Sequence, residues 1–479
     1  MPEKPVTIVQ IGALSTDGDG MYRVHEPGAA LAGLDGVEVY NVHYLSRWRD
    51  EAALAADVVV VYFTIDIELF RVFHQRRQLS RATFCEINDY FLDVQPWNPV
   101  HSSWSNPRRQ HYLTNLMARS DAVQVSSPPL AEHFRTHNAR IQVFPNHIAR
   151  LPPPREASTE RGLTIGWGGS AGHFKDVERV APVLVRWLAA HPEATLAVMA
   201  DPQYAALFAA VPRARFRLVP GGSLADYLAF VRTLDIGIAP MLPTEYNRCR
   251  SDVKFLEYAA NGAAAVVQRI EPYLRSVRDG ETGFLVGDDA ELVAALDRLA
   301  AEPEVRRRVA AAAYDYVRRE RLLEQHVRAR LELYRSPTRR AAAPAVTAPP
   351  PSRPLPSRPL RSLPGLEPRG VRLWQLEPSS PAERRFLEGL TAMDAADLAG
   401  ALAAFTEAIR LAPDYSQACY YAGRCLARQG RMAEAEQAYQ AAVRINPYYS
   451  RPLRALGDLH GALAADYRRR SDELNPPLP

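Results

Sequence analysis

Apolar runs of five to seven residues alternate with amphipathic stretches along the first part of the chain. These runs are rich in Val and Ile, which is typical of buried strands, and they lie at 6–12, 37–42, 57–63, 82–87, 122–127 and 141–145. Apolar residues at helical spacing fall between some of them, at 67–79 and 108–119. This alternation predicts a parallel, doubly wound sheet.

A second series of apolar runs begins after the prolines at 152–154. Its members lie at 163–167, 195–200, 216–220, 236–240, 263–268 and 283–287, and a helical pattern with few breakers then covers 290–335. We therefore predict an α/β protein with two Rossmann-like domains in tandem, an acceptor-side domain over 1–150 and a donor domain over 151–335.

The strand and helix patterns are both interrupted from residue 336 to residue 372. Ten prolines lie among Ala, Ser and Arg, and no acidic residue occurs between Glu332 and Glu367. This composition predicts a flexible linker over 336–372, partly in polyproline II conformation. Its PxxP motifs could bind an SH3-like module, and its arginines could contact an anionic surface. A plain spacer is the simpler interpretation.

A repeat of 34 residues follows, within a predicted helical domain over 373–479. Gly389, Ala401, Phe405, Ala408 and Pro413 recur 34 positions later as Gly423, Ala435, Tyr439, Ala442 and Pro447. This pattern resembles the tetratricopeptide repeat, in which small residues let two helices approach, an aromatic side chain fills the seam and Pro ends the second helix. Gly457 opens a partial third unit, and we expect a last helix over 453–467 to cap the array.

The composition is that of an ordinary globular protein, with 47% hydrophobic and 23% charged residues and a net charge of +4. This charge is too small to indicate nucleic acid as a partner. The four cysteines form no CxxC pair and no cluster at zinc spacing, so we expect reduced thiols and no metal site. No apolar run matches a signal peptide or a membrane span. We therefore expect a cytoplasmic protein with at most peripheral contact with the inner face of the membrane.

The segment NRCRSDVKFLEYAANGAAAVV, residues 247–267, places cations at the start of a predicted helix. Arg250 and Lys254 flank the first turn of this helix, over 253–260, although a helix N-terminus favours acidic residues. Lys254 and Glu257 are three residues apart and share one face. A salt bridge on a solvated face would explain the pair. Alternatively, the missing anion is a ligand whose phosphates meet the cations and whose ribose meets the carboxylate.

A glycine-rich loop follows the first strand of the second predicted domain, in the sequence LTIGWGGSAGHFKD. Gly168, Gly169 and Ser170 would let backbone N–H groups approach a phosphate, and Lys175 lies at the start of the next helix. A tight strand–helix turn without a ligand is the other interpretation. The spacing is not GxGxxG, but Asp201 after the next strand could bind a ribose, so a dehydrogenase remains an alternative.

Residues 1–335 as a whole resemble GT-B fold glycosyltransferases of the family 4-like group (glycosyl transferase group 1). SDVKFLEYAANGAAAVV is similar to the family's K-x-x-E-x-x-A-x-G-x-x-V-V segment, which implies that Lys254 binds the donor diphosphate and Glu257 its ribose. The glycine-rich loop also resembles the family's, and this resemblance places four residues near the phosphates: Gly168, Gly169, Ser170 and Lys175.

Two positions depart from the family pattern. Cys249 stands where many members have a glutamate eight residues before the ribose glutamate, and Trp167 stands where many have an arginine. Arg250 is the candidate to supply the missing positive charge. Donor specificity therefore does not carry over from the family.

The resemblance implies a retaining, metal-independent transfer from a nucleoside-diphosphate sugar, with no cofactor and with a UDP- or GDP-sugar as the donor substrate. Lys254 and Arg250 would stabilise the leaving diphosphate, and no acidic pair is placed to hold Mg²⁺. The first domain would bind a protein, peptide or glycan acceptor. Asp89 is the candidate catalytic residue there, and further acceptor-side candidates are Arg23, His25, Glu86 and Asn88.

The repeats would bind the acceptor or a partner protein, so protein glycosylation and glycan biosynthesis both remain open. A non-catalytic scaffold with a degenerate transferase domain is an alternative that Cys249 favours. A nucleotide-sugar epimerase of the same architecture is another, although the sequence offers no convincing set of catalytic carboxylates and histidines.

Overall fold

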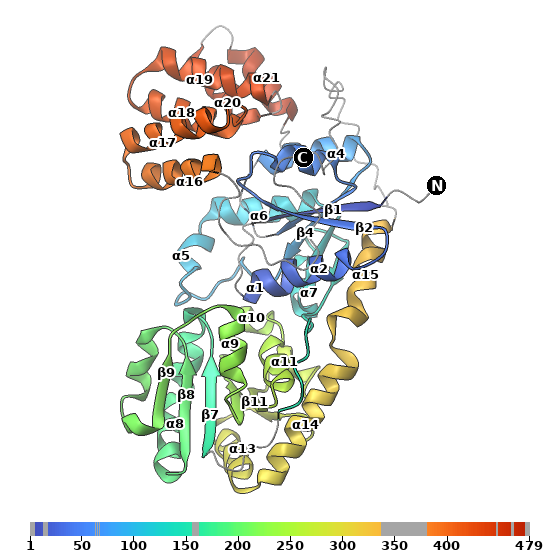
Figure 1. The fold of residues 1–479 in the computed structure, drawn as a ribbon, viewed down its shortest axis with the longest axis vertical. Coiled ribbons are helices and arrows are strands. Elements are labelled where there is room, and N and C mark those ends of the chain that lie inside the picture. The colour runs from blue at the N-terminus through green and yellow to red at the C-terminus, as the bar shows by residue number, and fades with distance from the viewer. Residues whose placement is uncertain are drawn as a thin grey trace.

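Three units follow one another along the long axis of the molecule (Figure 1). The computed structural model describes residues 5–12, 18–62, 64, 66, 68–155, 162–336, 381–446, 449–460 and 464–474. The predicted linker at 336–372 therefore lies almost wholly outside the described residues. In Figure 1 the first sheet occupies the middle, the second sheet lies at one end, and a bundle of helices lies at the other.

Six parallel strands form the first sheet of the described chain, in the order β2-β1-β3-β4-β5-β6. The strands are β1 (Val6–Gly12), β2 (Val37–His43), β3 (Val58–Tyr62), β4 (Ala82–Ile87), β5 (Ala122–Val125) and β6 (Ile141–Val143). The helical elements are α1 (Gly18–Gly20), the π-helix η1 (Met21–His25), α2 (Glu26–Ala32), α3 (Arg49–Ala55), α4 (Glu68–Gln78), α5 (His101–Trp104), α6 (Pro107–Arg119) and α7 (Pro128–Phe134). Ile8 and Val9 point to opposite faces and join different apolar clusters, so both faces are covered, as the continuous apolar runs predict.

The second sheet also has six parallel strands in the described residues, in the order β12-β11-β10-β7-β8-β9. They are β7 (Leu163–Gly168), β8 (Ala194–Met199), β9 (Phe216–Val219), β10 (Ile236–Ala239), β11 (Ala264–Gln268) and β12 (Phe284–Val286). Around them lie η2 (Ala171–His173), α8 (Phe174–Ala190), η3 (Pro202–Phe208), η4 (Arg213–Arg215), α9 (Leu224–Val231), α10 (Glu245–Arg248), α11 (Val253–Ala260), α12 (Glu271–Leu274), α13 (Asp289–Ala301) and α14 (Pro303–Glu320). The predicted fold class of two Rossmann-like sheets is confirmed.

The last helix of the predicted donor domain packs on the first sheet instead. The pattern at 290–335 forms three helices, α13, α14 and α15 (Leu323–Arg335), and α15 runs from the second unit to the first (Figure 1). Leu331 of α15 joins the apolar cluster that contains Ile8. Arg330 donates to Glu86 at 3.0 Å inside the first unit. The chain therefore crosses between the two sheets a second time.

The repeat domain consists of helix pairs, as the 34-residue period predicts. The described helices are α16 (Pro381–Asp394), α17 (Leu398–Leu411), α18 (Ser416–Arg428), α19 (Met432–Ile445), α20 (Ser450–Leu459) and α21 (Ala464–Leu474). A Cβ atom on Gly389 would lie 2.5 Å from Phe405, and one on Gly423 would lie 2.6 Å from Tyr439, so each glycine admits the aromatic ring of the paired helix. Pro447 lies outside the described residues.

The end of the array differs from the expectation of one helix over 453–467. Helix α20 ends at Leu459 and a separate helix, α21, begins at Ala464. His460, directly after α20, packs against Tyr467 of α21 with the two rings tilted and their centroids 6.3 Å apart. The third unit is therefore also a helix pair. No helix in the described part of the chain combines the length and the apolar character needed to cross a bilayer.

The repeats dock on the first sheet domain through polar contacts. The Ser450 hydroxyl donates to Glu68 at 2.8 Å, and Arg451 forms an ion pair with Asp66 at 3.1 Å. The Tyr415 hydroxyl donates to the backbone carbonyl of Leu45 at 3.0 Å. Glu68 is only 1% exposed, so this carboxylate is enclosed between the two units. The linker joins two units that contact each other directly.

Candidate functional site

Lys254 and Glu257 lie on one face of α11, and their side chains meet two tyrosines. Glu257 accepts hydrogen bonds from Tyr22 at 3.2 Å and Tyr227 at 2.9 Å. Lys254 donates to the Tyr227 hydroxyl at 2.9 Å and lies 3.6 Å from the Glu257 carboxylate. Glu257 is 3% exposed, which excludes a salt bridge on a solvated face. We call these four residues the Lys254–Glu257 cluster.

The two tyrosines bring separate parts of the chain to this cluster. Tyr227 comes from α9 in the second unit, whereas Tyr22 comes from η1 in the first unit. Burial, with a further contribution from the Glu257 charge, raises the pKa of both phenols well above the ordinary value. Both hydroxyls therefore remain donors to the carboxylate, and the site spans the two sheet domains.

The N-terminus of α11 carries an unusual charge arrangement. Asp252 precedes the helix but makes no side-chain cap, and its carboxylate instead binds Arg321 at 2.5 Å. Within the described helix, no acidic residue lies in the first turn. No carboxylate within the helix therefore balances the positive end of its dipole. This positive potential is available to an anion.

The glycine-rich loop contacts the cluster at Gly168. A Cβ on Gly168 would lie 2.7 Å from Tyr227, so this glycine lets the tyrosine pack against β7. The N–H of Gly169 donates to the Met199 carbonyl at 3.0 Å, so in this structure Gly169 does not offer that donor to a phosphate. Ser170 is exposed at the start of η2.

Lys175 lies apart from these contacts. Its ammonium group forms an ion pair with Glu178 of the same helix at 2.5 Å, and the side chain is 42% exposed. The structure thus brings Lys254, Glu257 and Gly168 together and leaves Lys175 on the surface of α8. A phosphate contact by Lys175 stays a prediction.

Arg250 and Asp89 face each other across the two sheet domains. The Arg250 Nε atom lies 3.9 Å from Asp89, and the Tyr246 hydroxyl donates to Asp89 at 3.2 Å. Burial opposes the charge of Arg250, but Asp89 and Tyr246 hold its pKa above the ordinary value. Among the described residues, the buried Nη1 atom of Arg250 has no hydrogen-bond partner. Arg250 therefore has a donor left for a ligand.

His173 is a site residue that the sequence did not single out. Its Nδ1 lies 2.9 Å from Asp176, which also accepts from Asn247 at 2.9 Å. Burial and the neighbouring Arg250 charge lower the pKa of His173 to about 4, so the imidazole is neutral at pH 7. The contact with Asn247 ties the glycine-rich loop to α10. The segment HFKD places His173 and Asp176 three residues apart, which was the available signal.

Glu26 is a second missed residue, at the start of α2. Burial and the charge of Glu257 raise the pKa of Glu26 to about 7. Its Oε2 atom is buried without a hydrogen-bond partner in the described part of the chain. No sequence pattern pairs Glu26 with Glu257, because 231 positions separate them (257 − 26).

Two acceptor-side candidates have structural roles instead. The guanidinium of Arg23 binds Glu86 and also donates to the Phe144 carbonyl at 2.7 Å, and Arg330 binds the other Glu86 oxygen. Arg23 is 2% exposed and Glu86 is 1% exposed. These groups hold α15 against the first sheet. Asn88 is different, because its buried Oδ1 atom has no hydrogen-bond partner within the described residues.

Asp201, the candidate ribose ligand of a dehydrogenase, caps a short helix. Its carboxylate accepts from the N–H of Gln203 at 3.1 Å at the start of η3. This contact accounts for an acidic residue at the end of β8 without a ligand.

Comparison with known protein families gives two matches, one in the second sheet domain and one in the repeats. Residues 183–333 match the family described as glycosyl transferase-like, and residues 386–450 match the tetratricopeptide repeat. No curated protein sequence matches the chain.

Solved structures resemble the two sheet domains together. Sucrose-phosphate synthase from Thermosynechococcus elongatus superposes with a TM-score of 0.51 at 15% identity, over 69% of this chain and 98% of that one. HepE from Anabaena in complex with UDP gives a TM-score of 0.51 at 14% identity, over 68% and 99%. HepE in complex with UDP-glucose gives 0.51 at 12% identity, over the same shares. At these identities the likeness shows the fold. The chain therefore contains a segment that matches the glycosyl transferase-like family and a segment of tetratricopeptide repeats, and its two sheet domains together have the GT-B fold.

Proposed function

We propose that the chain transfers a sugar from a nucleoside-diphosphate sugar, with retention of configuration and without a catalytic metal ion, to a protein or glycan acceptor. The observation that carries this proposal is the Lys254–Glu257 cluster beside the uncompensated N-terminus of α11. A cation, a helix N-terminus and a buried carboxylate suit a diphosphate that is attached to a ribose. We propose a UDP- or GDP-sugar as the donor and no separate cofactor.

Each residue has a distinct role in this proposal. Glu257 exchanges its hydrogen bond from Tyr22 for one from a ribose hydroxyl. Lys254 and Arg250 stabilise the charge that develops on the leaving diphosphate, which removes the need for a divalent cation at the reacting bond. The Nη1 donor of Arg250, which has no hydrogen-bond partner among the described residues, supports this role. Asp89 orients Arg250 from the acceptor side.

A protein or glycan acceptor would enter from the first sheet domain. The repeats dock on that domain through Ser450 and Arg451, so they are held against the domain that we propose binds the acceptor. A non-catalytic scaffold is the competing function, and the position of Cys249 in the apolar core of the first domain is the observation that favours it.

The experiment is a turnover assay with UDP-glucose and GDP-mannose, in which proton NMR follows the released sugar. We expect the α-anomer to appear first and the rate to be unchanged by added Mg²⁺ or Mn²⁺. We expect Lys254→Met to lower turnover by at least about a hundredfold, since one preorganised electrostatic contact contributes that much. Arg444→Met, an exposed change in the repeats, is the matched control. Initial release of the β-anomer would refute retention, and no release from any donor would favour the scaffold.

A further inference from the structure

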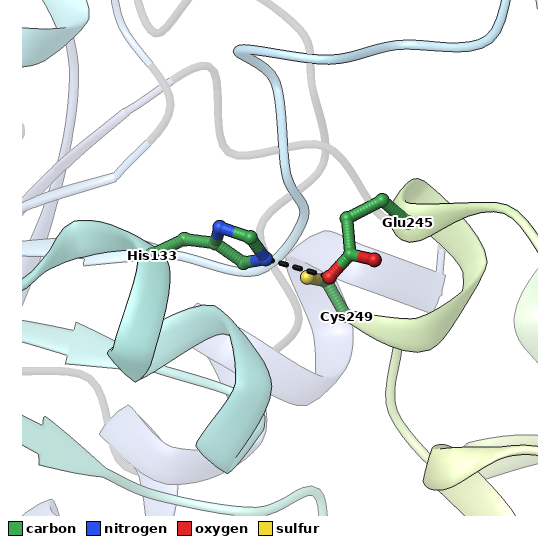
Figure 2. Close-up of side chains that lie close together, drawn as sticks. All are labelled: His133, Glu245 and Cys249. Atoms are coloured by element: carbon green, nitrogen blue, oxygen red, sulfur yellow. Dashed lines mark hydrogen bonds and ion pairs between the residues drawn. The ribbon is translucent and has the colours of Figure 1, made fainter.

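Three metal-binding side chains meet where α7 of the first domain contacts α10 of the second. They are His133, Glu245 and Cys249, and their ligand atoms all lie within 4.8 Å of one another. Figure 2 shows the imidazole, the carboxylate and the thiol pointing toward one another. His133 Nε2 lies 2.7 Å from Glu245 Oε1, and these two side chains are 31% and 41% exposed, while Cys249 is fully buried. The cluster therefore combines a buried thiol with an entrance from solvent.

Neighbouring residues hold each of the three side chains. Glu245 and Cys249 are four residues apart, so the single turn of α10 places them on one face. The Ser127 hydroxyl donates to the Cys249 carbonyl at 2.5 Å, which fixes the cysteine backbone against the first domain. The Tyr90 ring stacks on His133 with centroids 4.3 Å apart. The three groups are thus positioned before any ion arrives.

A catalytic cysteine does not explain this arrangement. In a cysteine–histidine–carboxylate triad, one ring nitrogen faces the thiol and the other faces the carboxylate. Here the same edge of the His133 ring faces both groups (Figure 2).

One nitrogen, one carboxylate oxygen and one sulfur form a ligand set that Zn²⁺ favours, with a fourth position left for water. Tetrahedral coordination brings such ligand atoms to roughly 3.2–3.8 Å from one another, which small side-chain rotations achieve from the present separation. For the ion to bind, any hydrogen on His133 Nε2 must move to Nδ1 or to water, and the Cys249 thiol must release its proton to water.

We propose that His133, Glu245 and Cys249 bind a zinc ion that links the two sheet domains. The ion would fix α10 against the first domain, and α10 carries Tyr246, which contacts Asp89 across the same interface. This site lies outside the donor contacts of Lys254 and Glu257 and differs from the expectation of no metal site. Sequence spacing could not reveal it, because 112 residues separate His133 from Glu245.

The test uses Co²⁺ as a spectroscopic substitute for zinc in the full chain, after metal removal and without an affinity tag. We expect one equivalent of Co²⁺ to produce tetrahedral visible bands and a thiolate-to-cobalt band in the near ultraviolet, both displaced by Zn²⁺. Cys249→Ser should remove the thiolate band. Cys425→Ser, a buried thiol in the repeats, should keep it.

The absence of a thiolate band, or its persistence in Cys249→Ser, would overturn the proposal. His133→Gln and Glu245→Gln give an independent reading, because each should weaken Zn²⁺ binding by more than about tenfold while the metal-free unfolding temperature stays within the range of the control. Unchanged zinc affinity in both variants would also overturn it. None of these measurements depends on transferase activity, so the zinc site and the proposed function can fail separately.

Discussion

At the residue scale, the sequence predicted that Lys254 and Glu257 lie together but did not predict their neighbours. Lys254 and Glu257 follow from the spacing of a helix that carries cations where acids are expected. Tyr22 could not be found in this way, since it lies 235 residues from Glu257 and only the packing of two domains brings them together. Lys175 lies at the start of a helix and pairs with Glu178 one turn later, and its contact with a phosphate stays a prediction.

Glu26 gives a prediction about pH and stability. Its pKa is raised from 4.5 in the unfolded chain to about 7 in the folded protein, so the folded state binds the proton more tightly. The free energy of unfolding therefore falls as the pH rises from about 4.5 to about 7. Glu26→Gln removes this loss, and we expect it to be more stable than wild type by about 2–3 kcal/mol at pH 8.

Urea unfolding at pH 4.5 and pH 8 checks this expectation. The free energy of unfolding of Glu26→Gln should exceed that of wild type only slightly at pH 4.5, and by about 2–3 kcal/mol at pH 8. An equal difference in stability at both pH values would contradict the raised pKa of Glu26, because such a difference would come from packing and not from ionisation.

At the element scale, periodicity predicted strands and helices better than it predicted their partners. The twelve predicted strands all occur, and most of them are buried on both faces, whereas the edge strands β6 and β9 are partly exposed. The pattern at 290–335 is helical as expected. That pattern does not reveal that α15 leaves the second sheet for the first, because Glu86, Arg23 and Arg330 create that contact from three distant segments.

The repeat seam gives a prediction at this scale. Gly423→Ala places a methyl group 2.6 Å from the Tyr439 ring, so one helix of the pair must shift. We expect a loss of about 1–3 kcal/mol in the stability of the repeats, measured by circular dichroism during thermal unfolding. Ala403→Ser, an exposed change on α17, should leave the transition unchanged. Equal transitions in the two variants would contradict the close helix approach.

At the scale of the whole molecule, the sequence predicted a flexible linker before the repeats, whereas the structure shows the repeats docked on the first sheet domain. A proline-rich linker predicts independent movement of the repeats. The enclosed contacts of Glu68 with Ser450 and of Asp66 with Arg451 instead fix their position. Such contacts depend on charges that lie nearly 400 residues apart, and no local pattern in the chain signals them.

Docking is tested by charge reversal at this interface. Arg451→Glu would place a carboxylate beside Asp66 and Glu68, and like charges at this distance repel strongly when they are partly buried. We expect the radius of gyration from solution scattering to increase as the repeats separate. Arg444→Glu, an exposed reversal on α19, serves as the control and should leave the radius unchanged. The same radius in both variants would show that these ion pairs do not hold the domains.

The central claim is that the Lys254–Glu257 cluster binds a nucleoside diphosphate, and thermal stabilisation of the full chain by UDP, GDP, ADP, TDP and NAD tests it most directly. We predict that one nucleoside diphosphate raises the unfolding temperature, that Glu257→Gln abolishes the effect, and that Arg444→Ala, an exposed change in the repeats, retains it. Stabilisation by NAD alone with no effect of Glu257→Gln, or no stabilisation by any of these nucleotides, would contradict the account.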